Sequence, residues 1–182
     1  GKGETLFYLT AKTITGTVAQ EAFHILREKG LKFKVTAITA KEKLCFQDTP
    51  ECTPEKCPYA KGHFDRVNDA VYELWTTEEV YSREVIRAHA EKWHVCPFEM
   101  CLDLSIWVDG IICDYNYVFD PNVHLKRFFG ENISGDHIFL IDEAHNLVER
   151  GREMYSAGIS RRSLVALRKK IKKRFSKLAR TL

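Results

Sequence analysis

I-F-L-I-D-E-A-H-N, residues 138–146, is the stretch that decides the fold of this chain. Its four apolar residues are enough for a buried parallel strand, and they end abruptly in two carboxylates, a small residue and a histidine. In open α/β sheets the ligand crevice lies outside the carboxyl ends of the strands, so Asp142 and Glu143 are predicted to project into a site while residues 138–141 anchor them in the core. Acids so placed could hold magnesium and orient a water. The alternative is a polar helix start in which Asp142 or Glu143 acts only as a cap.

A β-α-β unit at the start of the chain predicts parallel strands beside this one. Residues 5–10, T-L-F-Y-L-T, read as a buried strand. Apolar residues at helical spacing follow, and Gly30 is a residue type that commonly ends such a helix. Residues 33–39 then form a second strand, which a right-handed crossover should place parallel to the first. A further strand is predicted at residues 109–113, D-G-I-I-C.

The composition is that of a globular chain. Hydrophobic residues make up 45% and aromatic residues 12% of the 182 residues, which excludes general disorder. No apolar run approaches the length needed to span a bilayer, and no signal peptide is recognisable, so we expect a cytoplasmic protein with no membrane partner. The chain does not begin with Met, which suggests an excised or processed fragment.

Positive charge is concentrated at the C-terminal end. Residues 160–182 hold ten Lys or Arg and no acid, which leaves 18 basic against 25 acidic residues in the rest of the chain. Apolar residues at helical spacing run through the same segment, so we expect a basic helix. Its charge either contributes to a nucleic-acid surface or forms a solvated face.

A cysteine-rich insertion is predicted between the second and third strands. Residues 41–59 contain Cys45, Cys52 and Cys57, three of the five prolines and little periodicity, so something other than a core should hold them. Cys96 follows two predicted helices, at residues 64–74 and about 78–93, that could fold back as a hairpin. Four thiolates could then converge, and such sulfur ligation suits either zinc or an iron–sulfur cluster.

The other interpretation of the cysteines is that they are scattered core thiols, since free cysteine is often buried. The proline-rich surroundings of Cys52 and Cys57 argue against it. Cys113 lies in a predicted strand and should belong to the core. Cys101 lies five residues after Cys96 on a predicted helix and is an outside candidate as a ligand.

Taken together, the motifs resemble one family, the iron–sulfur superfamily 2 DNA helicases that include XPD and bacterial DinG-like proteins. The likeness covers nearly the whole chain, and order plus spacing make it more specific than any single motif. The bacterial or archaeal branch looks most similar. The motifs, in chain order, are F-Y-L-T-A-K-T, L-C-F, E-C-T-P-E-K-C-P-Y-A-K-G, V-C-P-F-E, I-I-C-D-Y-N-Y-V-F-D-P and F-L-I-D-E-A-H-N.

The resemblance implies an α/β fold: a partial RecA-like parallel sheet with helices, a small, mostly helical Fe–S cluster insertion and the start of a helical arch domain. The first part of the motor domain would occupy residues 1–40 and the insertion residues 41–104. The second part, with the D-E-A-H motif, would occupy residues 105–155. The basic helix that begins the arch domain would occupy residues 156–182.

The same resemblance implies a [4Fe–4S] cluster ligated by Cys45, Cys52, Cys57 and Cys96, which favours iron over zinc.

It also makes L-T-A-K-T the motif that contacts the DNA backbone, so Thr10, Lys12 and Thr13 become candidates for phosphate contacts. These residues could equally form a helix N-terminus. The two roles are compatible, because such termini favour phosphates.

For the D-E-A-H motif the resemblance implies catalytic roles. Asp142 would hold magnesium, largely through water, and Glu143 would activate the water that attacks the γ-phosphate of ATP. His145 would couple the nucleotide state to the DNA side of the motor.

The implied function is that of an ATP-dependent helicase in DNA repair that unwinds DNA, with the cluster domain contacting DNA and aiding strand separation. Single-stranded and forked DNA are its implied partners. We expect a cytoplasmic, nucleoid-associated protein. The family also needs a phosphate loop and a second RecA-like domain, and neither is found in this sequence. The rest of a helicase chain is therefore an expected partner. We expect this polypeptide alone to lack ATPase activity.

Two other functions compete with this one. The chain could be a non-catalytic, Fe–S-stabilised module that binds single-stranded DNA, with Lys12, Lys61, Arg66 and the basic helix supplying charge. It could also be a metal-stapled structural domain without a nucleic-acid partner.

Overall fold

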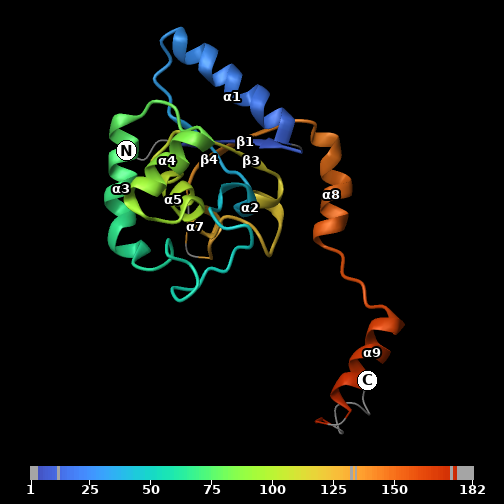
Figure 1. The fold of residues 1–182 in the computed structure, drawn as a ribbon. Coiled ribbons are helices and arrows are strands. Elements are labelled where there is room, and N and C mark those ends of the chain that lie inside the picture. Colours follow the sequence, from blue (N-terminus) through green and yellow to red (C-terminus); the bar gives the residue numbers. More distant parts are fainter. Residues whose placement is uncertain (1–3, 12, 132, 134, 173, 176–182) are drawn as a thin grey trace.

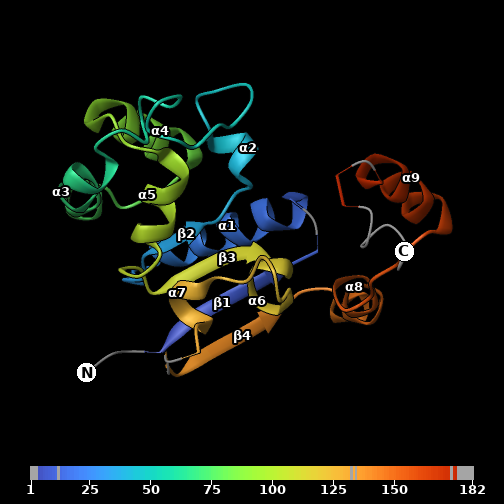
Figure 2. The same cartoon turned by 90° about the horizontal axis from the view of Figure 1, so that it is seen from below.

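The computed structural model describes residues 4–11, 13–131, 133, 135–172 and 174–175. Within them the chain forms one parallel sheet from β1 (Thr5–Thr10), β2 (Val35–Ala37), β3 (Gly110–Asp114) and β4 (His137–Ile141). The strand order is β2-β3-β1-β4, and every neighbouring pair is parallel. Figure 2 shows β3, β1 and β4 side by side, with arrowheads pointing toward the side where α8 lies. The predicted α/β class with a RecA-like parallel sheet is confirmed.

The helix α1 (Thr13–Glu28) makes the crossover between the first two strands and packs against β1, β2 and β3. Gly30, just past its end, adopts a φ of +98°, a left-handed conformation that glycine tolerates without steric cost. The β-α-β unit predicted from the start of the chain is therefore present.

Four helices lie between β2 and β3, where the cysteine-rich insertion was predicted. They are α2 (Lys41–Leu44), α3 (His63–Thr77), α4 (Arg83–Trp93) and α5 (Pro97–Leu104). The last three pack against one another beside the sheet (Figure 1). Their buried side chains belong to the same hydrophobic cluster as Phe7 and Ile111 of the sheet. Sheet and helices therefore share one core.

The second helix of this group begins later than predicted, at Arg83 and not near residue 78. One tertiary contact and one local contact explain the difference. Tyr81 forms an isolated β-bridge with Thr36, which keeps the preceding chain extended. The Ser82 hydroxyl then accepts a hydrogen bond from the Val85 amide at 3.3 Å and caps the helix.

The remaining elements follow the third and fourth strands. They are α6 (Asn116–Phe119), α7 (Lys126–Phe129), the 3₁₀ turn η1 (Ala144–Asn146), α8 (Leu147–Met154) and α9 (Arg161–Ile171). The basic helix α9 extends beyond α8, away from the sheet (Figure 1). None of the helices built from the described residues is long and apolar enough to cross a membrane.

The burial predicted for the strand before D-E-A-H is wrong. Ile138, Phe139 and Leu140 are 44%, 39% and 45% exposed. The reason is the strand order: β4 stands at the end of the sheet, and among the described residues only β1 pairs with it. An edge strand has one neighbour in place of two, so the same apolar run is covered less completely.

Candidate functional site

The carboxyl ends of β1, β3 and β4 bring together polar residues from three distant parts of the chain. Thr10 pairs with Asp114 in the register of β1 and β3. On the other side of β1, the Asp142 amide continues the pairing of β4 by donating to the Leu9 carbonyl oxygen at 2.9 Å. Parallel pairing thus places two carboxylates and a hydroxyl at one edge of the sheet. The sequence predicted this position for Asp142 but not for Asp114.

The turn that carries the two acids of D-E-A-H has an unusual backbone. Glu143 has φ 51° and ψ 45°, in the left-handed region that non-glycine residues seldom occupy. The Asn146 amide and side-chain nitrogen both donate to the Glu143 carbonyl oxygen, at 2.9 and 3.1 Å. The chain leaves the strand, turns through η1 and enters α8 directly. Glu143 is the N-cap residue of η1, but its side chain makes no capping hydrogen bond there. The N-cap residue of α8 is Asn146.

The side chains of the turn are accessible. The Glu143 carboxylate lies 3.2 Å from His145 Nδ1, and the two side chains are 54% and 74% exposed. A pair this exposed adds little stability. Beneath the turn, burial and the nearby charge of Asp142 both raise the pKa of the Tyr8 hydroxyl. Tyr8 therefore stays neutral beside the carboxylate.

An ion pair ties the third strand to the helix after the turn. Arg150 of α8 places its guanidinium 3.3 Å from the Asp114 carboxylate at the end of β3. Since α8 follows directly after the turn, this contact holds the exit of the D-E-A-H segment at the same edge of the sheet.

A cavity of about 300 Å³ opens at the carboxyl ends of β1, β2 and β3. Thr10, which is only 4% exposed, lines it together with Thr39, Lys43, Asp114 and Asn116. The Asn116 side-chain oxygen is buried and has no hydrogen-bond partner among the described residues. A buried acceptor of this kind favours a polar ligand in the cavity.

Of the other candidate phosphate contacts, Thr13 begins α1, as the helix-start interpretation expected. Lys12 lies outside the described residues.

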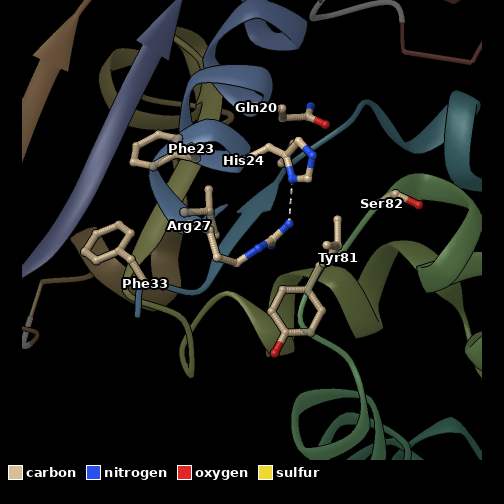
Figure 3. A pocket seen from close by; sticks show the side chains of 10 residues that line it. Gln20, Phe23, His24, Arg27, Phe33, Tyr81 and Ser82 are labelled. Carbon is tan, nitrogen blue, oxygen red and sulfur yellow. Dashed lines mark hydrogen bonds between the residues drawn. The ribbon is translucent and has the colours of Figure 1, made fainter. Parts of the chain in front are cut away.

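A smaller cavity, of about 80 Å³, lies between α1, β2 and residues 80–82 (Figure 3). Arg27 extends along it, donating one hydrogen bond to the Glu79 carbonyl oxygen at 2.9 Å and lying 2.9 Å from His24 Nδ1. The rings of Phe23 and Phe33 stack beside it, 5.8 Å apart. The lining contains none of the candidate residues that the structure describes, and we interpret this cavity as a packing seam between α1 and the insertion.

The four cysteines predicted as cluster ligands lie on neighbouring segments of the insertion. Cys45 directly follows α2, Cys52 and Cys57 lie in the irregular segment before α3, and Cys96 is the N-cap residue of α5. All four are free thiols. Across the described part of the chain, no three His, Cys, Asp or Glu side chains are arranged to hold a metal ion. The cluster stays a prediction.

The surroundings of the thiols nevertheless suit bound anionic sulfur. The Gln47 amide donates to the Cys45 sulfur at 3.4 Å, and the backbone of Phe98 and Glu99 donates to the Cys96 sulfur. Burial raises the pKa of the Cys96 thiol, and these backbone hydrogen bonds oppose that effect. Four cysteines, two of which have amide donors to their sulfurs, are a donor set that fits an iron–sulfur cluster.

Lys41, on α2, stands among these thiols. Partial burial lowers its pKa, but a hydrogen bond to Cys52 and the charges of Cys52, Glu99 and Cys96 outweigh burial and leave the pKa raised. The ammonium group also lies 5.4 Å from the centre of the Phe98 ring. A cation fixed between two candidate ligands would offset the negative charge of a thiolate-bound cluster.

The remaining cysteines belong to the core. The Cys101 thiol is fully buried and contacts Thr36 and the Ala37 carbonyl oxygen, and burial raises its pKa to about 11. Burial raises the pKa of the Cys113 thiol in β3 still further. Cys113 matches its prediction, and Cys101 is a packed core residue.

Arg66 has a structural role, and the DNA contact considered for it stays a prediction. Its guanidinium donates to the carbonyl oxygens of Trp93, His94 and Lys61 at 3.1, 2.7 and 2.9 Å. These bonds satisfy main-chain acceptors at the end of α4. They also tie that end to the loop before α3.

Comparison with known proteins identifies the family. The family model described as DEAD_2 matches residues 23–164. The chain belongs to the DEAD_2 family. The predicted likeness to XPD-like superfamily 2 helicases is thereby confirmed.

Two curated relatives of this DEAD_2 chain match over part of their length. It is 28% identical over 100 residues to the "Fanconi anemia group J protein homolog" of Gallus gallus. It is 32% identical over 114 residues to the "General transcription and DNA repair factor IIH helicase subunit XPD/RAD3" of Saccharomyces cerevisiae. These matches cover 55% and 63% of the chain but only 7% and 14% of the relatives.

A solved structure, "Truncated XPD", has the same fold, with a TM-score of 0.59 at 20% sequence identity. That match covers 92% of this chain and 48% of the other.

Residues that sequence reasoning missed include Lys41, Arg150 and Tyr115. Tyr115 lies within a quoted motif, D-Y-N-Y, yet nothing in its spacing predicts a contact with residues 142 and 143. Lys41 and Arg150 read as ordinary surface charges in the sequence. Each acquires its role from a partner at least ten residues away in the chain, and only folding brings the two together.

Proposed function

We propose that this chain is a segment of an ATP-dependent DNA helicase in which Asp142, Glu143 and His145 form the acidic part of the nucleotide site. The observation that carries the proposal is the position of D-E-A-H. It follows β4 immediately, beside the ends of β1 and β3, in a chain of the DEAD_2 family. Ligands of open α/β sheets bind at this edge.

The roles of the acids follow from their places in the turn. Asp142, held to β1 through its amide, would bind magnesium, largely through water. Magnesium at this position would neutralise charge on the phosphates. The exposed Glu143 carboxylate would take a proton from the attacking water, and His145, 3.2 Å away, would orient that carboxylate. The remaining phosphate contacts would come from a phosphate loop and a second RecA-like domain in the same helicase.

The nucleic-acid side of the proposal rests on the cavity at the ends of β1, β2 and β3. Thr10, Thr39 and Lys43 line it, and α1 begins close by at Thr13. Hydroxyls, a lysine and a helix N-terminus are groups that bind phosphates without reading sequence. Single-stranded DNA, including the strand arms of a fork, is therefore the proposed ligand, with Thr10, Lys12 and Thr13 on its backbone.

We further propose that Cys45, Cys52, Cys57 and Cys96 hold a [4Fe–4S] cluster. The cluster would crosslink the irregular segment before α3 to the start of α5, which couples metal binding to local folding. Anaerobically purified protein should absorb in the visible and contain iron and sulfide. Colourless protein with stoichiometric zinc would contradict the assignment.

The decisive experiment is the Glu143→Gln substitution in the full-length protein that contains this chain. Loss of a general base commonly costs about 10²- to 10⁴-fold in rate. ATP hydrolysis should therefore fall by that order while ATP binding persists. A matched control is Glu149→Gln, which changes an exposed carboxylate of α8 paired only with Arg152 among the described residues. Hydrolysis unchanged by Glu143→Gln would refute the proposal.

The basic helix α9 favours a second candidate, a non-catalytic module that binds single-stranded DNA. Its basic residues, among them Arg161, Arg162 and Lys169, are exposed on a helix that extends away from the sheet. Phosphate binding must weaken as salt rises. Salt-dependent binding of single-stranded DNA by a full-length protein that lacks ATP turnover would select this module over the helicase.

A further inference from the structure

Tyr115 is a fully buried tyrosine, 0% exposed, at the point where β3 gives way to α6. Its hydroxyl donates to the main-chain carbonyl oxygens of two consecutive residues, Asp142 and Glu143, the second at 3.1 Å. One hydroxyl proton shared between two acceptors is a three-centre hydrogen bond. The contact spans 27 and 28 residues of sequence and reaches only main-chain atoms of the turn.

The backbone of Tyr115 is held by hydrogen bonds on both sides. Its amide donates to the Thr10 carbonyl oxygen at 3.3 Å, which ties it to the end of β1. Its carbonyl oxygen accepts from the amides of Val118 and Phe119. A buried side chain whose backbone is bonded on both sides can act as a fixed reference point for a neighbouring turn.

The turn of Asp142 and Glu143 has a strained backbone, which surrounding contacts must hold in place. Glu143 occupies the left-handed region, where a side chain crowds the following carbonyl oxygen. Conformations of this kind persist only where surrounding contacts over-determine them, and they cluster at functional sites. Here Tyr115 fixes the carbonyls of residues 142 and 143 from the core side, and Asn146 fixes the second of them from within the turn.

We propose that Tyr115 is a positioning residue for the acids of the D-E-A-H turn: by holding both carbonyl groups it sets the direction in which the Asp142 and Glu143 side chains leave the backbone. This inference rests on the proposed ATPase function. Rotating either peptide group would swing the attached carboxylate, and displacing a catalytic group by about 1 Å can cost about 100-fold in rate.

The test is Tyr115→Phe in the full-length protein, which removes the hydroxyl and keeps the ring. The expected result is a kcat for ATP hydrolysis lowered about 10- to 100-fold with a KM for ATP within about twofold of the unmodified protein, because most of the phosphate contacts would come from the phosphate loop, outside the turn. Tyr155→Phe is the matched control. That hydroxyl donates to the Phe119 carbonyl oxygen at 2.9 Å, and the residue is exposed and outside the turn.

Hydrogen exchange gives a readout that does not depend on turnover. In Tyr115→Phe the amides of Asp142 and Asn146 should exchange about tenfold faster or more, while those of Ile111 and Ile112 in β3 keep their protection. Equal acceleration across the sheet would mean that Tyr115 serves the core alone and would overturn the proposal.

The kinetic outcomes separate this inference from the function on which it rests. If Glu143→Gln abolishes hydrolysis but Tyr115→Phe leaves kcat unchanged, the positioning role is refuted and the proposed function stands. If Glu143→Gln leaves hydrolysis intact, both are refuted.

Discussion

Replacing Lys34 by methionine should loosen the joint between the sheet and the insertion. Lys34 lies just before β2, and its ammonium group reaches across to the insertion, where it donates to the carbonyl oxygens of Trp75 and Glu78 and to the Tyr81 hydroxyl at 3.0 Å. It also lies 4.7 Å from the Trp75 ring centre. The two carbonyls belong to the end of α3, where a positive charge is favourable.

The size of the effect follows from these contacts. A hydrogen bond made by a charged group contributes about 1.5–3 kcal/mol, and a cation–π contact of this kind about 0.5–1 kcal/mol. Methionine keeps the packing of the aliphatic part of the lysine side chain but leaves the carbonyl oxygens without this donor. In the unmodified protein, the solvation that the ammonium group loses on folding partly offsets the stabilisation by its contacts. We expect the free energy of unfolding to fall by about 2 kcal/mol, which is a Tm lowered by about 4–8 °C for a chain of this size.

The assay is thermal and urea unfolding followed by circular dichroism, with Lys32→Met as the control, since that neighbouring side chain is exposed and the described structure shows no contact for it. A loss below about 0.5 kcal/mol, or an equal loss in the control, would refute the reasoning, because surface changes alone fall within that range.

Two further changes test other parts of the structure. Between pH 9 and about 11 the Cys101 thiol, whose pKa burial raises from 9.0 to about 11, stays protonated when folded but ionises when unfolded, so stability should fall as pH rises through this window. Across this window the free energy of unfolding should fall by about 2–3 kcal/mol because of Cys101, and Cys101→Ala should remove that fall. Unfolding curves recorded at several pH values measure it, and an unchanged pH dependence in the variant would contradict the prediction. Arg66→Met should lower the free energy of unfolding by about 1–3 kcal/mol, because it strips a charged donor from three carbonyl oxygens. Arg66→Met should leave the affinity for single-stranded DNA, and the salt dependence of that affinity, unchanged. A weaker salt dependence in the variant would show that Arg66 contacts DNA.

The D-E-A-H segment shows which features a local sequence pattern can predict. The apolar run followed by D-E-A-H predicted a strand that ends in two acids, and β4 ends at Ile141 with Asp142 next in the chain. The prediction succeeded because side-chain periodicity and strand ends are local properties. The burial of the same strand depends on how many neighbours it acquires, which local pattern does not contain.

Sequence alone therefore determined the parallel α/β class, the order of the motifs and the chemical types at the strand ends, since each follows from residues close together in the chain. Tertiary structure alone decided that β4 lies at the sheet edge, that Lys34 and a shared core join the insertion to the sheet, and that the Tyr115 hydroxyl holds the turn of Asp142 and Glu143. These features are contacts between residues about 30 or more positions apart. Their physical cause is the order of the strands and the packing of helices against the sheet, which bring together residues that lie far apart in the sequence.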